Sequence, residues 1–236
     1  FFKTNNSNKM KIDSLGKIKF YTGFLDVNNG TNGTFGTTDD YSLLLKTSDT
    51  TRITIDNRGS IYLRDTVRSR TYGTIYKGTN RFLHNTWNNY PNLGGTSYNL
   101  FLGLDAGNFT LGQVTNNINN VFEGNYNLGI GWRALNAVTT GYYNFILGNN
   151  TGTLITSGAS NLAIGNYAFR NLTVGVGNVG IGNNSMGYSG TSVYCNTLIG
   201  NNAGLGVAGV SAYWGNTGIG NSVLATMTSK KKNICI

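Results

Sequence analysis

A five-residue phrase recurs through residues 99–236 and limits what this chain can fold into. It consists of an asparagine, three mostly apolar residues ending in Ile or Leu, and a glycine. Successive asparagines, counting an eighth start at Asn233, are 28, 17, 17, 17, 18, 20 and 17 residues apart. Repeats this short are typical of a solenoid, in which each coil buries its apolar face only against its neighbours. We therefore predict an all-β solenoid whose coils are defined by Asn99 and Gly103, Asn127 and Gly131, Asn144 and Gly148, Asn161 and Gly165, Asn178 and Gly182, Asn196 and Gly200, and Asn216 and Gly220.

Alternate positions within the phrase belong to opposite faces of a strand. The residues one and three after the asparagine, such as Leu162 and Ile164, are apolar or Thr, and we predict that they fill the inside of the coil. The residue between them, such as Ala163, never carries a charge either. A strand that avoids charge on both faces is buried on both faces. We therefore expect the second face to contact other copies of the chain around a rotation axis.

Three further columns of residues support the coil. A small residue follows six of the seven phrase glycines by three positions, as a tight corner requires: Ala106, Ala134, Thr151, Ala168, Ser185 and Ala203. A turn glycine precedes several asparagines by three positions: Gly124, Gly141, Gly158 and Gly175. Asparagines at one phase predict a ladder of side-chain amides, each donating to the next coil.

The N-terminal part of the chain contains an ungapped duplication, in which residues 2–20 align with residues 45–63. Each copy has an alternating strand, a turn (Asp13–Gly16 or Asp56–Gly59) and a second strand. This pattern indicates a β-hairpin, with Asp accepting hydrogen bonds in the turn and Gly supplying a positive φ. Isolated hairpins are marginal in water, so we expect them to pair with other copies of the chain. The predicted domains are duplicated β-hairpin shaft segments in 1–63 (1–20 and 44–63), a junction at 64–98 and β-solenoid repeats at 99–236.

The formal charge of +9 invites a nucleic-acid interpretation, but its distribution argues against one. Residues 1–98 hold 13 Lys and Arg against 7 Asp, and residues 99–236 hold 5 against 2 acids. Phosphate tracking would need cations repeated at one phase of the coil. The one cationic run, 230–232, falls between two phrase starts and is interpreted as a solvated turn. We therefore predict no nucleic-acid partner.

Residues suited to catalysis or metal binding are scarce in the repeats. Asp105 and Glu123 are the only acids there, at different phases, although a glycosidase cleft needs two carboxylates flanking the bond. Partner chains could complete such a pair, so a polysaccharide-cleaving spike stays an alternative. His84 is the only histidine. It either packs at the junction or lies on the symmetry axis of an oligomer, where three copies of its side chain could come together. We predict no enzyme activity, metal or cofactor, and we interpret Cys195 and Cys235 as small buried side chains.

Aromatic residues in the variable parts of the coils allow two interpretations. They could stack against sugars on the outside of the rod, or they could pack between coils or subunits, which we favour for any one of them. The residues concerned are Tyr142, Tyr143, Tyr167, Tyr188, Tyr194, Tyr213 and Trp214.

The segment Asn161-Leu-Ala-Ile-Gly-Asn-Tyr-Ala168 resembles the NTAIGYQAL-type repeats of bacteriophage tail fibres and, more distantly, the coils in the head domains of trimeric autotransporter adhesins. The segment from Thr47 to Leu63 and the entry from Phe82 through Asn108 are also similar to phage fibre shafts. The 17-residue spacing is longer than the usual autotransporter coil and favours the phage family.

This resemblance implies an elongated homotrimer that belongs to the tail fibre of a virion. Its expected function is attachment to a glycan or protein receptor on the host surface, with other tail or baseplate proteins as partners. The alternatives are a bacterial trimeric surface adhesin and a polysaccharide-depolymerising tail spike. Because the chain starts without Met and stops within a phrase, we expect it to be a piece of a longer protein.

Overall fold

Regular structure in the chain is entirely β. The computed structural model describes residues 2–4, 7–12, 18–20, 41–47, 50–63, 74–84, 98–108, 123–188, 190, 192–206, 212–226 and 232–236. These residues form strands and turns without a helix, which confirms the all-β prediction, and so none of them forms a helix that could span a membrane. The chain divides into two units, residues 1–45 with 53–62 and residues 46–52 with 63–236.

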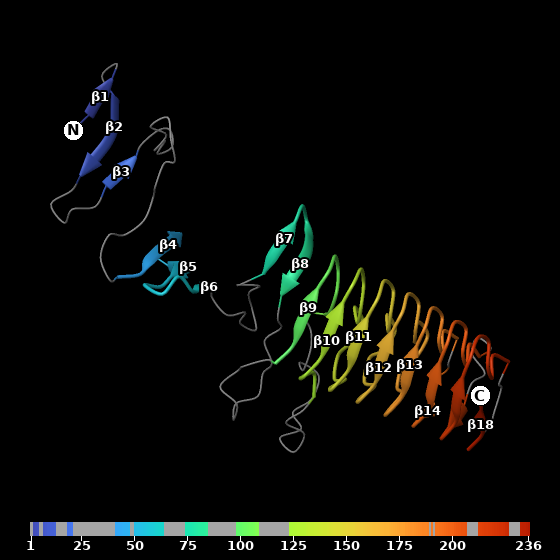
Figure 1. Cartoon of the computed structure of the whole chain (residues 1–236). Coiled ribbons are helices and arrows are strands. Elements are labelled where there is room, and N and C mark those ends of the chain that lie inside the picture. Colours follow the sequence, from blue (N-terminus) through green and yellow to red (C-terminus); the bar gives the residue numbers. More distant parts are fainter. Residues whose placement is uncertain are drawn as a thin grey trace. The chain divides into compact units, whose positions relative to one another are not determined.

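The duplicated N-terminal segments each form a three-stranded sheet with the same strand order (Figure 1). The first sheet contains β1 (Phe2–Thr4), β2 (Ser7–Ile12) and β3 (Ile18–Phe20), and the second contains β4 (Leu43–Thr47), β5 (Thr50–Ile55) and β6 (Ile61–Leu63). β5 and β6 begin 43 residues after β2 and β3, as the duplication requires. The turn at 13–16 lies outside the described residues, and the assignment of these sheets to a shaft stays a prediction.

The turn between β5 and β6 is organised by Asp56. Its Oδ1 accepts hydrogen bonds from the backbone N–H groups of Arg58 (2.9 Å) and Ser60 (2.8 Å), and its Oδ2 accepts one from the Tyr62 hydroxyl (3.1 Å). Gly59 has a φ of +83°, which a residue with a Cβ rarely adopts. The hydrogen bond from the Ser60 backbone, followed by those from Arg58 and Tyr62, lowers the pKa of Asp56 from 3.8. The turn therefore uses both features expected from the sequence.

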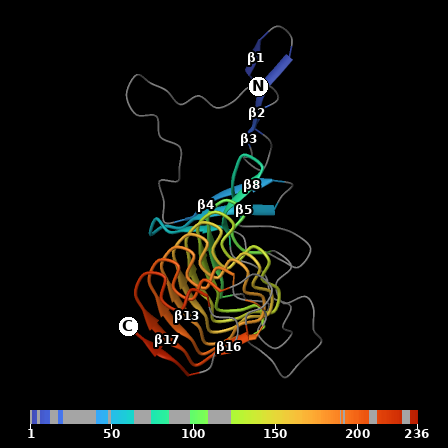
Figure 2. The ribbon, with the colours of Figure 1, turned by 90° about the vertical axis from the view of Figure 1, so that its right-hand side faces the viewer.

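The described residues between 99 and 236 form a β-solenoid in which each phrase supplies one short strand (Figures 1 and 2). The strands pair in parallel and in register from coil to coil, so that Leu128 faces Phe145 and Phe145 faces Leu162. They are β9 (Leu100–Leu102), β10 (Leu128–Ile130), β11 (Phe145–Leu147), β12 (Leu162–Ile164), β13 (Val179–Ile181), β15 (Thr197–Ile199), β17 (Thr217–Ile219) and β18 (Ile234–Cys235). The predicted 17-residue solenoid is therefore confirmed.

Four further strands complete the described structure of this region. β7 (Ile75–Lys77) and β8 (Asn80–His84) form an antiparallel pair, and β8 continues the solenoid sheet by pairing antiparallel with β9. Part of the predicted junction thus extends the solenoid sheet. β14 (Ser192–Tyr194) and β16 (Ala212–Trp214) pair in parallel in a separate sheet, and both fall in coils longer than 17 residues.

The two faces of the repeated strand are the reverse of those predicted from the sequence. The middle residue points into the coil: Phe101, Ile146, Ala163 and Leu198 are fully buried. The residues on either side of it are half-buried or exposed in β9, β10, β11, β12, β13, β15 and β17. The prediction was wrong because the side chains on both faces of the strand are apolar. Their alternation therefore does not indicate which face lies inside the coil. The small middle residues, such as Gly129, fit the narrow interior.

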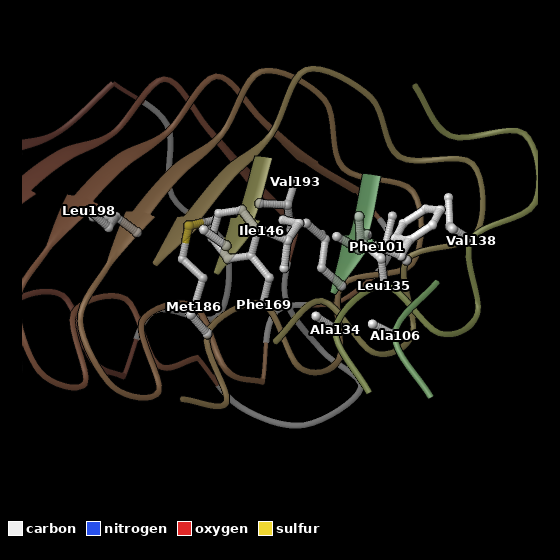
Figure 3. Close-up of a cluster of buried hydrophobic side chains, with 14 of the residues drawn as sticks. Phe101, Ala106, Ala134, Leu135, Val138, Ile146, Phe169, Met186, Val193 and Leu198 are labelled. Carbon is white, nitrogen blue, oxygen red and sulfur yellow. The ribbon is translucent and has the colours of Figure 1, made fainter. Parts of the chain in front are cut away.

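The interior of each coil holds one large side chain at either of two positions (Figure 3). One position is the middle of the strand, and the other is four residues after the phrase glycine. Phe101, Ile146 and Leu198 occupy the strand position in coils with Gly at the corner, whereas Leu135, Phe169, Met186 and Leu224 occupy the corner position in coils with Gly or Ala in the strand. A Cβ built on Gly107 would collide with the Phe101 ring of the same coil, and one on Gly204 with the Leu198 side chain of its own coil. Close packing therefore admits a large side chain at only one of these two positions in a coil, although further corner residues such as Ile155 and Leu172 are also fully buried.

The repeated asparagines form a buried ladder of amides along the solenoid. Asn144 Oδ1 accepts hydrogen bonds from the backbone N–H (3.2 Å) and the side-chain Nδ2 (3.0 Å) of Asn161. Asn161 Nδ2 also donates to the carbonyl of the turn glycine Gly175 at 2.7 Å. The same pattern of amide bonds continues through Asn127, Asn178, Asn196, Asn216 and Asn233. Each amide of this ladder thus finds partners, as buried polar groups require.

The phrase glycines stack as closely as backbones allow. Gly165 has a φ of +130°, and a Cβ there would lie 2.5 Å from the carbonyl oxygen of Gly182. The other phrase glycines have φ values between +126° and +139°. Neither the conformation nor the spacing leaves room for a side chain.

Both cysteines are exposed, which corrects their prediction as small buried side chains. Cys195 directly precedes Asn196 and has a φ of +54°, a conformation that turns its side chain away from the interior. Cys235 is the register partner of Gly218 between β17 and β18, in the column of middle strand residues, and both residues of β18 are exposed.

Candidate functional site

An apolar strip covers the outside of the solenoid sheet. We call it the outer strip, and it consists of the first and third residues of the strands from β9 to β17: Leu100, Leu102, Leu128, Ile130, Phe145, Leu147, Leu162, Ile164, Val179, Ile181, Thr197, Ile199, Thr217 and Ile219. Leu100 is 46% exposed and Phe145 44% exposed. None of these positions carries a charge. Contiguous exposed apolar surface of this kind marks an interaction site in soluble proteins.

Parallel register makes the outer strip continuous. Leu128, Phe145, Leu162 and Val179 occupy successive rungs of one column. Since the interior is already filled from the other face of the same strands, these side chains are not needed for the core of a coil. The outer strip can therefore contact a partner without unfolding any coil.

A row of tyrosines lies beside the asparagine ladder. Tyr98, Tyr126 and Tyr143 each directly precede a ladder asparagine, and their rings stack with centroid separations of 5.1 and 4.9 Å. Tyr142 meets the Tyr143 ring edge-on at 5.6 Å. These distances match the spacing between coils, so the rings bridge one coil to the next. For Tyr143, packing between coils is therefore the role that the structure shows, whereas Tyr142 packs against Tyr143 of its own coil.

A pocket of about 440 Å³ opens on the corner segments that follow three successive strands. We call it the basic pocket, and its lining residues are Trp132, Arg133, Asn150, Thr153, Leu154, Tyr167, Arg170 and Asn171. Trp132 is 47% exposed and Tyr167 41% exposed. Arg133 and Arg170 are also exposed, and the lining contains no acidic residue. The pocket thus combines two aromatic faces with two cations and several amide and hydroxyl groups.

Hydrogen bonds of backbone and side-chain groups between coils fix the residues that line the basic pocket. The N–H of Asn150 donates to the Trp132 carbonyl at 2.8 Å, and that of Trp132 donates to Asn149 Oδ1 at 3.0 Å. Thr153 Oγ1 donates to the Arg170 carbonyl at 3.1 Å. The Arg170 guanidinium lies 5.6 Å from the ring centre of Tyr167 and 5.8 Å from that of Tyr188, within the range of cation–π attraction. The site is consequently preformed.

Sequence reasoning missed the basic pocket because its residues occupy different phases of the repeat. Arg133 lies two residues after its phrase glycine and Arg170 five residues after its own, in coils that are not adjacent. Trp132 was not singled out at all. A usable signal was present: Arg133 and Arg170 are the only arginines of residues 99–236, and wrapping the sequence at 17 residues brings them to one corner.

The structure places the other predicted candidates apart from one another. Asp105 follows β9, and Glu123 precedes β10 by five residues. His84 pairs with Phe101 across β8 and β9, but its side chain is outside the described set. Within the described ranges, His, Cys, Asp and Glu form no group of three that could hold a metal. The absence of enzyme activity and of a cofactor stays a prediction.

The remaining aromatic and basic candidates lie near the far end of the solenoid. Tyr194 and Trp214 are partly exposed at the ends of β14 and β16, while the side chain of Tyr213 lies outside the described residues. Lys232 Nζ is 5.2 Å from the ring centre of Trp214. Lys230 and Lys231 lie outside the described residues, so the predicted solvated turn is not seen.

No family model matches the chain, and no curated protein or solved structure is significantly similar to it.

Proposed function

We propose that the chain is a structural component of a bacteriophage tail fibre, which attaches the virion to a glycan or protein receptor on the host-cell surface. The observation that carries the proposal is the outer strip. Each coil completes its own interior and still exposes apolar side chains along the sheet, as expected of one chain in an intertwined homotrimer. The resemblance of the repeats to those of phage tail fibres supports the same function.

Self-association would remove the outer strip from water. Because the strip holds no charged group, its burial carries no cost of desolvating ions, and the apolar area contributes favourably. A rotation axis parallel to the solenoid would place equivalent rungs of the three chains together. We also propose other tail or baseplate proteins as partners, and no nucleic-acid binding or enzyme activity.

The native mass tests the trimer. Light scattering is expected to give three times the 25.4 kDa of one chain. Phe145→Lys places a charge in the outer strip and should yield monomers, because an interface cannot bury an unpaired ammonium. Val174→Lys is the matched control, since Val174 is 37% exposed but lies outside the strands. A wild-type monomer, or equal loss of assembly in both variants, would refute the trimer.

Localisation tests the fibre function. Antibodies raised against the purified chain should label the tail fibres of the virus that encodes it, and the chain should compete with that virus for host cells. Labelling of a bacterial surface instead would establish the adhesin alternative. Release of oligosaccharides from host capsule incubated with the protein would establish the depolymerising spike.

A further inference from the structure

We infer that the basic pocket binds a sugar residue bearing a negatively charged group, a carboxylate or a phosphate. This inference rests on the proposed function, because surface glycans are the ligands that an attachment fibre would meet. It adds to that proposal a location, a set of contacts and the charge of the ligand.

The first step concerns charge. Residues 99–236 contain only five Lys and Arg, and two of these, Arg133 and Arg170, line the same pocket. No acidic residue in the lining neutralises them. Guanidinium groups bind carboxylates and phosphates through paired, charge-assisted hydrogen bonds. An anion is therefore the ligand that matches this pocket.

The second step concerns shape and polarity. Trp132 and Tyr167 present exposed rings, while Asn150 and Asn171 supply amides that can donate and accept hydrogen bonds. A sugar has an apolar face that covers an aromatic ring and hydroxyl groups that pair with amides. A simple inorganic anion would use the arginines and leave the aromatic rings unoccupied.

The third step concerns the backbone. The position two residues after the phrase glycine has a positive φ in every described coil, and Asp105, Asn184, Asn202 and Ser222 occupy it elsewhere. Such short polar residues tolerate this conformation best. In the basic pocket the same column holds Arg133 (φ +55°) and Tyr167 (φ +60°), so two larger side chains of the lining replace the short polar residues found in other coils. Core residues such as Phe169 also have a positive φ, so what distinguishes the pocket is the residue type at these positions and not the backbone.

The basic pocket is separate from the outer strip. Its lining residues lie in the corner segments, and none belongs to the strands that carry the strip. The strip and the pocket therefore use different residues, and self-association through the strip does not require those of the pocket.

Calorimetric titration of the full chain with two matched tetrasaccharides tests the inference. The hyaluronan tetrasaccharide carries glucuronate carboxylates, and chitotetraose is its neutral counterpart. We expect the acidic probe to bind at least about tenfold more tightly, and Arg133→Gln and Arg170→Gln each to weaken it by about tenfold. Lys232→Gln, which removes one cation outside the pocket, should leave the affinity unchanged. Trp132→Ala should weaken both sugars.

Four results would overturn the inference: equal affinity for the two tetrasaccharides, no binding of either at millimolar concentration, unchanged affinity in both arginine variants, or an equal loss in Lys232→Gln. Competition by glucose 1-phosphate distinguishes the source of the charge. If it displaces the acidic tetrasaccharide, phosphorylated sugars belong to the ligand class, and if it does not, the class is limited to carboxylated sugars.

Cell competition separates this inference from the proposed function. If the wild-type chain and the Arg133→Gln/Arg170→Gln variant compete equally well with the virus, the fibre function holds and the pocket is not the receptor site. If the wild-type chain binds the acidic sugar but does not compete, the pocket inference holds and the fibre function fails.

Discussion

The solenoid and the sheet of β4 to β6 differ in how far they bury their apolar side chains. Every coil from Phe101 to Leu198 buries hydrophobic residues completely, through its strand, its corners or both. Among the described side chains of β4 to β6 none is buried, and Ile61 is 67% exposed. A coil completes its core with residues of the same chain, whereas this sheet has apolar surface that only further contacts could cover. One chain is enough to bury the core of the solenoid, whereas we expect the apolar surface of this sheet to be buried only by assembly.

Removing one aromatic side chain from each region should give the largest contrast. Phe169→Ala empties a fully buried site and should lower the free energy of unfolding by about 3–5 kcal/mol. Tyr62→Ala removes a ring that is 56% exposed and should cost less than about 1 kcal/mol. Denaturant titration followed by circular dichroism, at one protein concentration, measures both. Similar losses in the two variants would show that the sheet is covered as completely as a coil.

Moving the large residue within one coil tests how independently a coil packs. Ile146→Ala should cost about 2–5 kcal/mol by leaving a cavity, and Gly152→Leu about 1–3 kcal/mol by overfilling the interior. The double variant reproduces the arrangement of Ala163 with Phe169, so it should be more stable than the sum of the single effects predicts. Gly152 has the same positive φ as Phe169, so the backbone accepts Leu there. Additive losses in the double-mutant cycle would contradict the rule that only one of these two positions in a coil holds a large residue.

Breaking the asparagine ladder should cost less than emptying the core. Asn161→Ala leaves the backbone and side-chain N–H groups of Asn178 without their acceptor, and Gly175 without its donor. Each unsatisfied buried group costs about 1–3 kcal/mol, and relaxation reduces the sum, so we expect about 3 kcal/mol. Asn166→Ala is the matched control, because Asn166 accepts a bond from Asn149 at an exposed position and should cost less than about 1 kcal/mol. Thermal unfolding measures the stability of both variants. Equal losses of stability would show that burial does not make the ladder bonds more important than exposed ones.

The smallest effect should come from the Asp56 turn. Hydrogen bonds from Ser60, Arg58 and Tyr62 lower the pKa of this carboxyl below 3.8. Ionised Asp56 therefore stabilises the turn fully above that unfolded-state value, and the contribution is lost as the pH falls through the lowered pKa. The protection factors of the Arg58 and Ser60 amides, which compare measured exchange with the intrinsic rate at the same pH, should fall in acid in the wild-type chain. Asp56→Asn should remove this fall in protection, and its persistence would assign the effect to another group.

The period of the repeat was enough to predict the solenoid, the strand positions and the columns of asparagine and glycine. Spacing carries this information because each coil must present the same groups to its neighbours. The direction of the strand faces was not predictable from alternation, since Leu162, Ala163 and Ile164 are all apolar. Side-chain volume would have decided it: Gly180 and Gly218 belong in the narrow interior, where a Cβ would strike Phe169 or Leu198.

The basic pocket could not be predicted from local motifs. Arg133 and Arg170 are 37 residues apart and share neither phase nor coil. They line one pocket because the corner segments of successive coils lie side by side, and this arrangement depends on the shape of the turns. The exposure of Cys195 could not be predicted from the sequence either. It follows from the positive φ of Cys195, a conformation that a cysteine does not indicate.

Dividing one large side chain between the strand and corner positions of each coil also constrains how such a gene can recombine. A crossover between two coils, in the segment before an asparagine, exchanges intact units and preserves the amide rungs. A crossover between the strand and its corner, for example between Ile146 and Gly152, would create a coil with large residues at both positions or at neither. Lineages that lengthen or shorten this solenoid should therefore show their breakpoints between coils.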